Sequence, residues 1–218
     1  MISWFDITLL GSFSVMAPAA TVIAAWLVLN RAWHLLLWWC LLFIGGMALV
    51  VTSKIAFIGW GIGLRSLNFT GMSGHAMRAA AVAPVLLYLL LQKTAGITRK
   101  SGVLMGLAFA VLIGISRLAV NAHSVSETIT GWLLGAIVSL SFIRILSYSP
   151  KIDLNRWVIV LSLIGLFATP YITPVPTQRW IIKAALFLSG HDQPYIRVNW
   201  KMATIKSRLP SSYAKTPW

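Results

Sequence analysis

The sequence predicts an all-α integral membrane protein with about six transmembrane helices. Of its 218 residues, 58% are hydrophobic and only 10% are charged, whereas a soluble domain of this size carries about 25% charged residues. The mean hydropathy is +0.82, and several apolar runs approach the roughly 20 residues that a helix needs to cross a bilayer. Because these runs are continuous rather than alternating, they argue against a membrane β-barrel.

The apolar runs place the expected spans at residues 8–29, 34–52, 76–91, 102–116, 124–147 and 157–173. Glycines interrupt the stretch between the second and third spans, as is typical of a re-entrant or surface loop. We expect residues 1–173 to form one membrane-embedded helical bundle and residues 174–218 to form a basic tail. Within the tail, residues 179–188 suit an interfacial helix, and equally a partly ordered tail with no specific function.

The formal net charge of +14 is spread over the turns between spans. Basic residues near Arg31, in 92–101 and in 147–156 favour a cytoplasmic position for these turns. The N-terminus, the loop 54–75 and the loop 116–123 would then lie on the outer face. Basic residues beside spans usually set topology or meet anionic lipid headgroups, so we expect membrane lipids rather than nucleic acid as partners.

The only glutamate of the chain, Glu127, falls inside an expected span, four residues after His123. On a helix these two side chains share one face. The carboxylate can accept the imidazole N–H and fix its tautomer, which leaves the other ring nitrogen free to attack or to bind a metal. The alternative is a neutral histidine that caps the span, with Glu127 paired for packing.

Arg117 lies six residues before His123 and can reach the same pocket. Its guanidinium group suits phosphate oxygens, although a lone arginine at this depth is more often an interfacial anchor.

A second polar patch is GMSGHAMR, residues 71–78. Ser73 and Gly74 stand where a helix begins, and free backbone N–H groups there favour an anion; Ser73 would equally serve as an N-cap. His75 could donate a proton to a leaving oxygen, and Arg78 adds positive charge. Two histidines and one glutamate among several cations suit phosphate better than a divalent metal. The residues therefore predict a phosphate site with one histidine as nucleophile and another as acid.

The second and third polar segments resemble motifs of the membrane type 2 phosphatidic acid phosphatase superfamily. The family pattern is KxxxxxxRP, then PSGH, then SRxxxxxHxxxD. Residues 116–127 match the third motif at identical spacing, with Glu127 in place of Asp, and residues 72–75 match the second with Met72 in place of Pro. The first motif is altered, since Lys54 and Arg65 are separated by ten residues rather than six.

The resemblance implies the function of each matching residue. His123 would be the phosphoryl-accepting nucleophile and Glu127 its orienting acid, while His75 would protonate the leaving oxygen and then help to activate water. The phosphoryl oxygens would be held by Arg117, Ser73, Gly74, Lys54 and Arg65. No metal or other cofactor is needed in this scheme, because fixed cations stabilise the transition state.

The resemblance implies a lipid phosphatase of a bacterial-type inner membrane, acting at the outer face. The expected substrate is a lipid phosphate or diphosphate, first a polyprenyl diphosphate such as undecaprenyl diphosphate, with phosphatidate-like lipids and lipid A next. The additional cation Arg78 favours a diphosphate. The altered residues leave two alternatives open, a non-catalytic lipid-phosphate-binding or transport protein and a lipid phosphotransferase.

Overall fold

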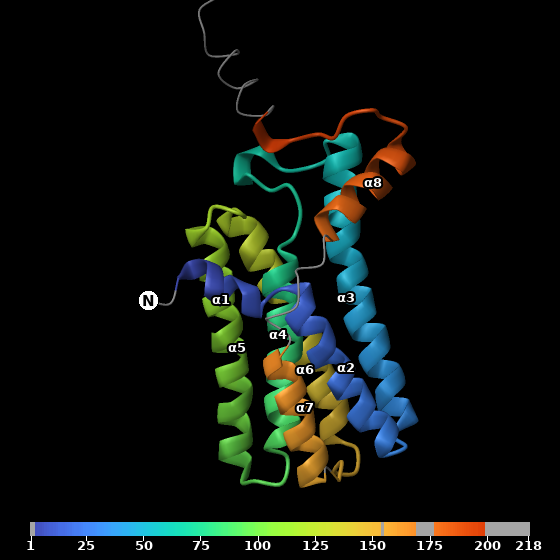
Figure 1. The fold of residues 1–218 in the computed structure, drawn as a ribbon, viewed down its shortest axis with the longest axis vertical. Coiled ribbons are helices and arrows are strands. Elements are labelled where there is room, and N and C mark those ends of the chain that lie inside the picture. Colours follow the sequence, from blue (N-terminus) through green and yellow to red (C-terminus); the bar gives the residue numbers. More distant parts are fainter. Residues whose placement is uncertain (1–2, 154, 169–176, 199–218) are drawn as a thin grey trace, which may run out of the picture.

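The computed structural model describes residues 3–153, 155–168 and 177–198, which hold α-helices, one 3-10 turn and no strand. The helices are α1 (Trp4–Leu10), α2 (Phe13–Leu29), α3 (Trp33–Trp60), α4 (Gly74–Leu90), α5 (Gly96–Ala119), α6 (Val125–Ser147), α7 (Arg156–Ala168) and α8 (Thr177–Ser189), with the turn η1 (Arg65–Leu67) after α3. The predicted all-α class is confirmed over these ranges (Figure 1).

Among the described residues, four helical segments are long and apolar enough to cross a membrane. They are Trp4–Leu29, which holds α1 and α2, then α3, α5 and α6. The helix α4 and the Trp157–Leu166 part of α7 are apolar but shorter. The chain is therefore a membrane protein, while the predicted number of six spans stays a prediction.

The prediction ended the second span too early. The helix α3 continues from residue 52 through Lys54 to Trp60, and Gly61 ends it in the left-handed conformation with φ of 69°. The continuation IAFIGW is apolar, so a single lysine does not interrupt the helix. Of the last predicted span, residues 169–173 lie outside the described residues.

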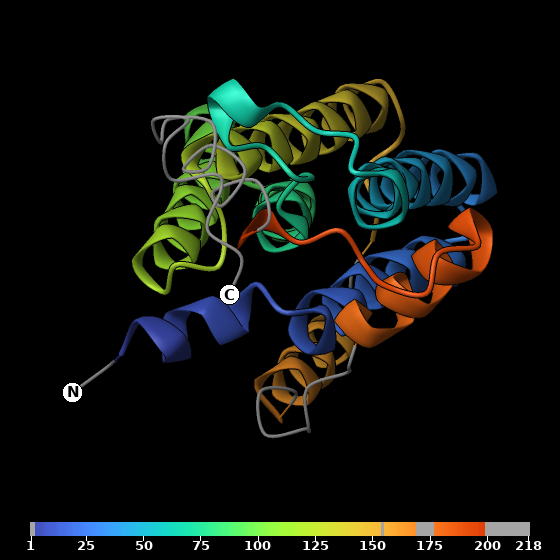
Figure 2. The same ribbon diagram turned by 90° about the horizontal axis from the view of Figure 1, so that it is seen from above.

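The short helix α4 occupies the centre of the bundle (Figure 2) and contacts α2, α3, α5 and α6. Its alanines 76, 79, 80 and 81 are fully buried. On the neighbouring helices, a side chain at Gly106 would meet the backbone of Pro84, and one at Gly135 would meet the carbonyl oxygen of Met77. Small residues on both sides thus allow close packing, as is common between helices in membranes.

The turns predicted for the cytoplasmic side lie together at one end of the bundle. The amide of Gln92 donates to the carbonyl of Ile152 at 2.6 Å and accepts from its N–H at 3.1 Å. The side chain of Asn30 accepts from the N–H of Asp153 at 2.8 Å, and Lys93 pairs with the same aspartate. The pKa of the exposed Asp153 carboxyl is lowered by its hydrogen bond from Lys93.

The opposite end carries α1, the loop from α3 to α4, the turn from α5 to α6, and α8 with the segment after it (Figure 1). The predicted helix 179–188 is present as α8, which packs along the upper part of α3 through buried Ala185, Phe57 and Ile58. This end holds the polar residues that the sequence singles out.

Candidate active site

A cavity of about 780 Å³ lies at this end of the bundle. Its apolar wall includes Phe13, Met47, Val51, Ile55, Ile58, Ile181 and Ala184. Its polar part holds Lys54, Thr70, His75, Arg78, Arg117, His123 and Arg197. None of the described lining residues is an aspartate or glutamate, so the cavity combines a wall suited to a lipid chain with a cationic part suited to an anion.

His123 lies in the turn between α5 and α6, one residue before the N-cap Ser124. The hydroxyl of Ser124 accepts from the N–H of Glu127, and the Glu127 carboxylate accepts from the N–H of Ser124 at 3.0 Å. This capping box fixes the first turn of α6. It also places Oε2 of Glu127 at 2.9 Å from Nδ1 of His123, so the predicted contact between the two side chains is present.

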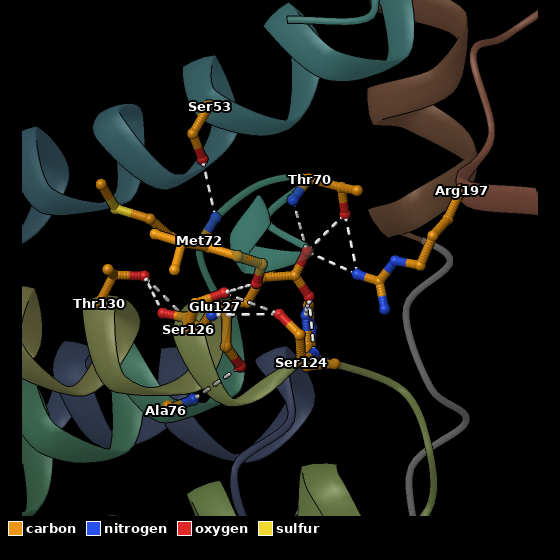
Figure 3. A network of polar contacts seen from close by, with 12 residues as sticks. Ser53, Thr70, Met72, Ala76, Ser124, Ser126, Glu127, Thr130 and Arg197 are labelled. Atoms are coloured by element: carbon orange, nitrogen blue, oxygen red, sulfur yellow. Dashed lines mark hydrogen bonds and ion pairs between the residues drawn. The ribbon is translucent and has the colours of Figure 1, made fainter. Parts of the chain in front are cut away.

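Glu127 is fully buried, and its second oxygen is held by other elements (Figure 3). Oε1 accepts from the N–H of Thr70 at 2.7 Å, from the Thr70 hydroxyl, and from Nη2 of Arg197 at 2.6 Å. A buried carboxylate is stable when a cation and several donors satisfy it. Glu127 therefore has one oxygen turned to His123 and the other to Thr70 and Arg197.

The chemical state of His123 depends on burial and on the charges around it. Burial lowers the pKa of its imidazole most, and the bond to Glu127 opposes that effect, while the positive charges of Lys54 and Arg117 lower the pKa further. The net effect is a pKa below the ordinary value. At neutral pH the ring is uncharged, and with Nδ1–H donated to Glu127 the lone pair resides on Nε2.

Two arginines bring largely buried guanidinium groups to the cavity. Nη2 of Arg78 donates to the carbonyl of Gly11 at 3.3 Å, and Nη1 of Arg117 donates to the hydroxyl of Thr8 at 3.0 Å. In the described part of the chain, the buried Nε atoms of Arg78 and Arg117 have no hydrogen-bond partner. Leaving a buried charged donor unpaired is costly, so the pair favours a ligand with several acceptor oxygens.

The second polar segment begins α4. Gly74 and His75 line the cavity from its first turn. Ser73 is fully buried, and its hydroxyl caps the helix at the N–H of Ala76, 3.5 Å away. Ser73 is therefore the N-cap of α4, which is one of the two functions that the sequence offered for it. Ser73 is not among the residues that line the cavity, so its contact with phosphate stays a prediction.

The sequence model of the PAP2 superfamily matches residues 61–151. The chain belongs to the PAP2 superfamily. An uncharacterized 22.5 kDa protein in the cps region of Klebsiella pneumoniae is 36% identical over 202 residues, which are 90% of this chain and 97% of the relative. Phosphatidylglycerophosphatase B of Bacillus subtilis (strain 168) is 32% identical over 91 residues, 41% of this chain and 43% of the relative. No solved structure matches the chain.

In this PAP2 superfamily protein, the two basic residues of the altered first motif lie in different places. Lys54 projects from the last turns of α3 and lines the cavity. Arg65 lies in the exposed turn η1 and is not among the residues that line the cavity. The extra residues between them follow the end of α3 at Gly61 and carry Arg65 away, so the geometry supports Lys54 but not Arg65 as a phosphate ligand.

Two polar residues of the site were missed by the sequence reasoning. Thr70 precedes Gly71 in a glycine-containing loop, and Arg197 was one of several basic residues of the tail. Arg197 lies 70 residues from Glu127 along the chain and outside the PAP2 match. No spacing rule connects positions so far apart, so the sequence could not predict the contact of Arg197. Thr70 is a polar residue close to the SGH segment, and this proximity could have indicated that it belongs to the site.

Proposed function

We propose that this protein is a membrane lipid phosphatase that cleaves a phosphomonoester or a diphosphate through a phosphohistidine on His123. PAP2 membership supports phosphatase activity in general. The observation that carries the finer proposal is the bond between His123 and Glu127, 2.9 Å long, beside a cavity with several cations. That arrangement supplies a neutral, oriented nucleophile next to groups that bind phosphate.

In the first step, the lone pair on Nε2 of His123 attacks phosphorus, and the bond from phosphorus to the leaving oxygen breaks. That oxygen is the ester oxygen of a lipid phosphomonoester or the bridging oxygen of a lipid diphosphate, whose leaving group is the lipid monophosphate. Glu127 stabilises the positive charge that develops on the imidazole. His75, in the first turn of α4, gives its proton to the leaving oxygen. Lys54, Arg78 and Arg117 stabilise the negative charge on the phosphoryl oxygens.

In the second step, water attacks the phosphohistidine and the bond from phosphorus to nitrogen breaks. His75, now neutral, accepts a proton from that water. Inorganic phosphate leaves, and both histidines return to their starting states. The scheme uses no metal ion, because side-chain cations balance the charge.

The substrate is proposed from the two parts of the cavity. The apolar wall suits an acyl or prenyl chain. The polar part holds four cations, of which Arg197 is paired with Glu127, and the other three favour a diphosphate such as undecaprenyl diphosphate. The name of the Bacillus subtilis relative makes phosphatidylglycerophosphate the second substrate to test. By the distribution of basic turns, we place the site on the outer face of a bacterial inner membrane.

The test is phosphate release from a panel of lipids in detergent with EDTA present. The panel holds undecaprenyl diphosphate, phosphatidylglycerophosphate, phosphatidate and lipid A. His123→Ala should lose the activity, and His34→Ala, at the opposite end of the molecule, should keep it. A radiolabelled substrate should leave an acid-labile label on the wild type and none on His123→Ala.

Each other outcome excludes part of the proposal. Turnover by His123→Ala would refute the nucleophile, and loss of wild-type turnover in EDTA would point to a metal enzyme. Binding of every lipid without phosphate release would favour the non-catalytic binding or transport protein. Transfer of the label to a second lipid, rather than to water, would make the protein a phosphotransferase.

A further inference from the structure

The segment that follows α8 returns across the cavity. The N–H of Tyr195 donates to the carbonyl of Ile58 at 2.9 Å, and Nδ1 of His191 lies 2.8 Å from the carbonyl oxygen of Gly59. Both carbonyls belong to the last turn of α3. Residues 194–197 therefore form part of the cavity lining because two contacts hold the segment on α3.

Arg197 extends from this segment to the buried carboxylate of the site (Figure 3). Its Nη2 atom donates to Glu127 Oε1 at 2.6 Å and to the Thr70 hydroxyl at 3.0 Å. Only 27% of the Arg197 side chain is exposed, and Glu127 is not exposed at all. A charge-assisted bond between partners with this burial restricts the carboxylate far more than a surface ion pair would.

The two oxygens of Glu127 have separate partners. Oε2 contacts His123 and the N–H of Ser124, while Oε1 is held by Thr70 and Arg197. Rotation of the carboxylate about its terminal torsion, which is otherwise soft, would break bonds on both oxygens. The partners of Oε1 therefore set the direction in which Oε2 meets the imidazole.

We propose that Arg197 is a positioning residue, supplied by the C-terminal segment, that orients Glu127 and through it His123. This proposal deepens the proposed phosphatase function and rests on it for its kinetic consequences. Arg197 acts on the reaction without touching the phosphorus in this scheme. The C-terminal segment is then part of the site rather than an appendage of the bundle.

A merely structural contact is the competing explanation. In that case Arg197 would only anchor the C-terminal segment, and its loss would reduce stability or the folded fraction. The two explanations differ in what they predict for His123. Positioning through Glu127 changes the ionisation and the kinetics of His123, whereas anchoring alone leaves both unchanged in the folded molecules.

The kinetic test compares Arg197→Gln and Arg197→Lys with Arg179→Gln, which removes an exposed arginine from α8. Arg197→Gln should lower kcat by about 10- to 100-fold with little change in KM, because a charge-assisted bond to the orienting carboxylate is lost. Arg197→Lys should recover part of the loss, and Arg179→Gln should match the wild type. Wild-type kcat in Arg197→Gln would overturn the proposal.

A second measurement is independent of turnover. The chain has 4 histidines, so an NMR titration of protein with isotope-labelled histidine can be assigned with single His→Ala variants. The charged and titratable groups around His123 are Lys54 of α3, His75 of α4, Arg117 of α5 and Glu127 of α6. Removing the positive charge of Arg197 beside Glu127 should raise the pKa of His123 by about one unit.

The titration separates the failure of the two proposals. If the wild type releases no phosphate from any lipid, the phosphatase proposal fails, and a shifted His123 titration in Arg197→Gln still supports the positioning contact. An unshifted titration would overturn the inference, whatever the activity. A thermal unfolding curve for each variant shows that the compared proteins are folded.

Discussion

The backbone N–H of Ser73 donates to the backbone carbonyl of Glu127 over 2.9 Å. This bond joins the start of α4 to the first turn of α6, and so joins the two motifs on which the family resemblance rests. Gly131, one turn further along α6, lies so close to Ser73 that a side chain there would meet the Ser73 carbonyl. His75, in the first turn of α4, and His123, in the turn just before α6, are thus held at two helix starts that this bond joins.

Two substitutions of Glu127 should distinguish the effect of its charge on kcat from the effect of its side-chain length. Glu127→Gln should lower kcat at least about 100-fold, because an amide neither stabilises the imidazolium nor secures the same tautomer. Glu127→Asp keeps the charge but is one methylene shorter, so it cannot hold His123 and Thr70 together, and we expect a smaller loss. Phosphate release from the preferred lipid measures both, and equal rates for Glu127→Gln and the wild type would contradict the assignment.

The pH dependence of kcat/KM should reflect the lowered pKa of His123. Protonation removes the attacking lone pair, and a lowered pKa means that protonation occurs only at more acidic pH than in a free histidine. The acidic limb of the profile should therefore lie below about pH 6.5, the ordinary value for a histidine. Lys54→Gln removes a cation that lowers this pKa, so its acidic limb should move to higher pH.

The altered first motif can be tested with a matched pair of variants. Lys54→Gln should lower kcat/KM by roughly tenfold or more, since it removes a cation from the cavity. Arg65→Gln should change kcat/KM less than about threefold, because Arg65 does not line the cavity and salt screens an exposed charge at a distance. The reverse order of the two losses would show that η1 moves onto the substrate.

Close helix packing makes Gly135 sensitive to a single methyl group. Gly135→Ala would place a Cβ against the carbonyl oxygen of Met77, and we expect a destabilisation of about 1–3 kcal/mol. Gly45→Ala is the control, because nothing lies within 4 Å of its added Cβ and alanine favours the helix. Thermal unfolding in detergent should show a lower midpoint for Gly135→Ala alone.

At the end of the bundle opposite the cavity, the buried Gln92 side chain is hydrogen-bonded to the backbone of Ile152. Gln92→Leu removes both buried hydrogen bonds to Ile152 and leaves two backbone groups unpaired, so unfolding should become easier by about 2 kcal/mol. Lys93→Gln, at the adjacent exposed position, should have little effect on unfolding because surface ion pairs contribute little. Phosphate release should be unchanged in both, since this end is remote from the cavity.

The sequence by itself determined the membrane class and the local part of the site. Long apolar runs have few stable alternatives to helices in a bilayer, because backbone groups must pair internally there. Likewise, a four-residue separation at a helix start brings His123 to Glu127 whatever surrounds them. These features depend on short-range geometry, which the order of residues specifies directly.

Only the tertiary structure decided which distant cations reach the cavity. Lys54 is inside because α3 continues to Trp60, and Arg65 is outside because the chain turns away at Gly61. Arg197 meets Glu127 because α8 packs on α3 and the following segment is fixed to its last turn. Contacts across 70 residues depend on how whole helices pack, and no local pattern in the sequence encodes that arrangement.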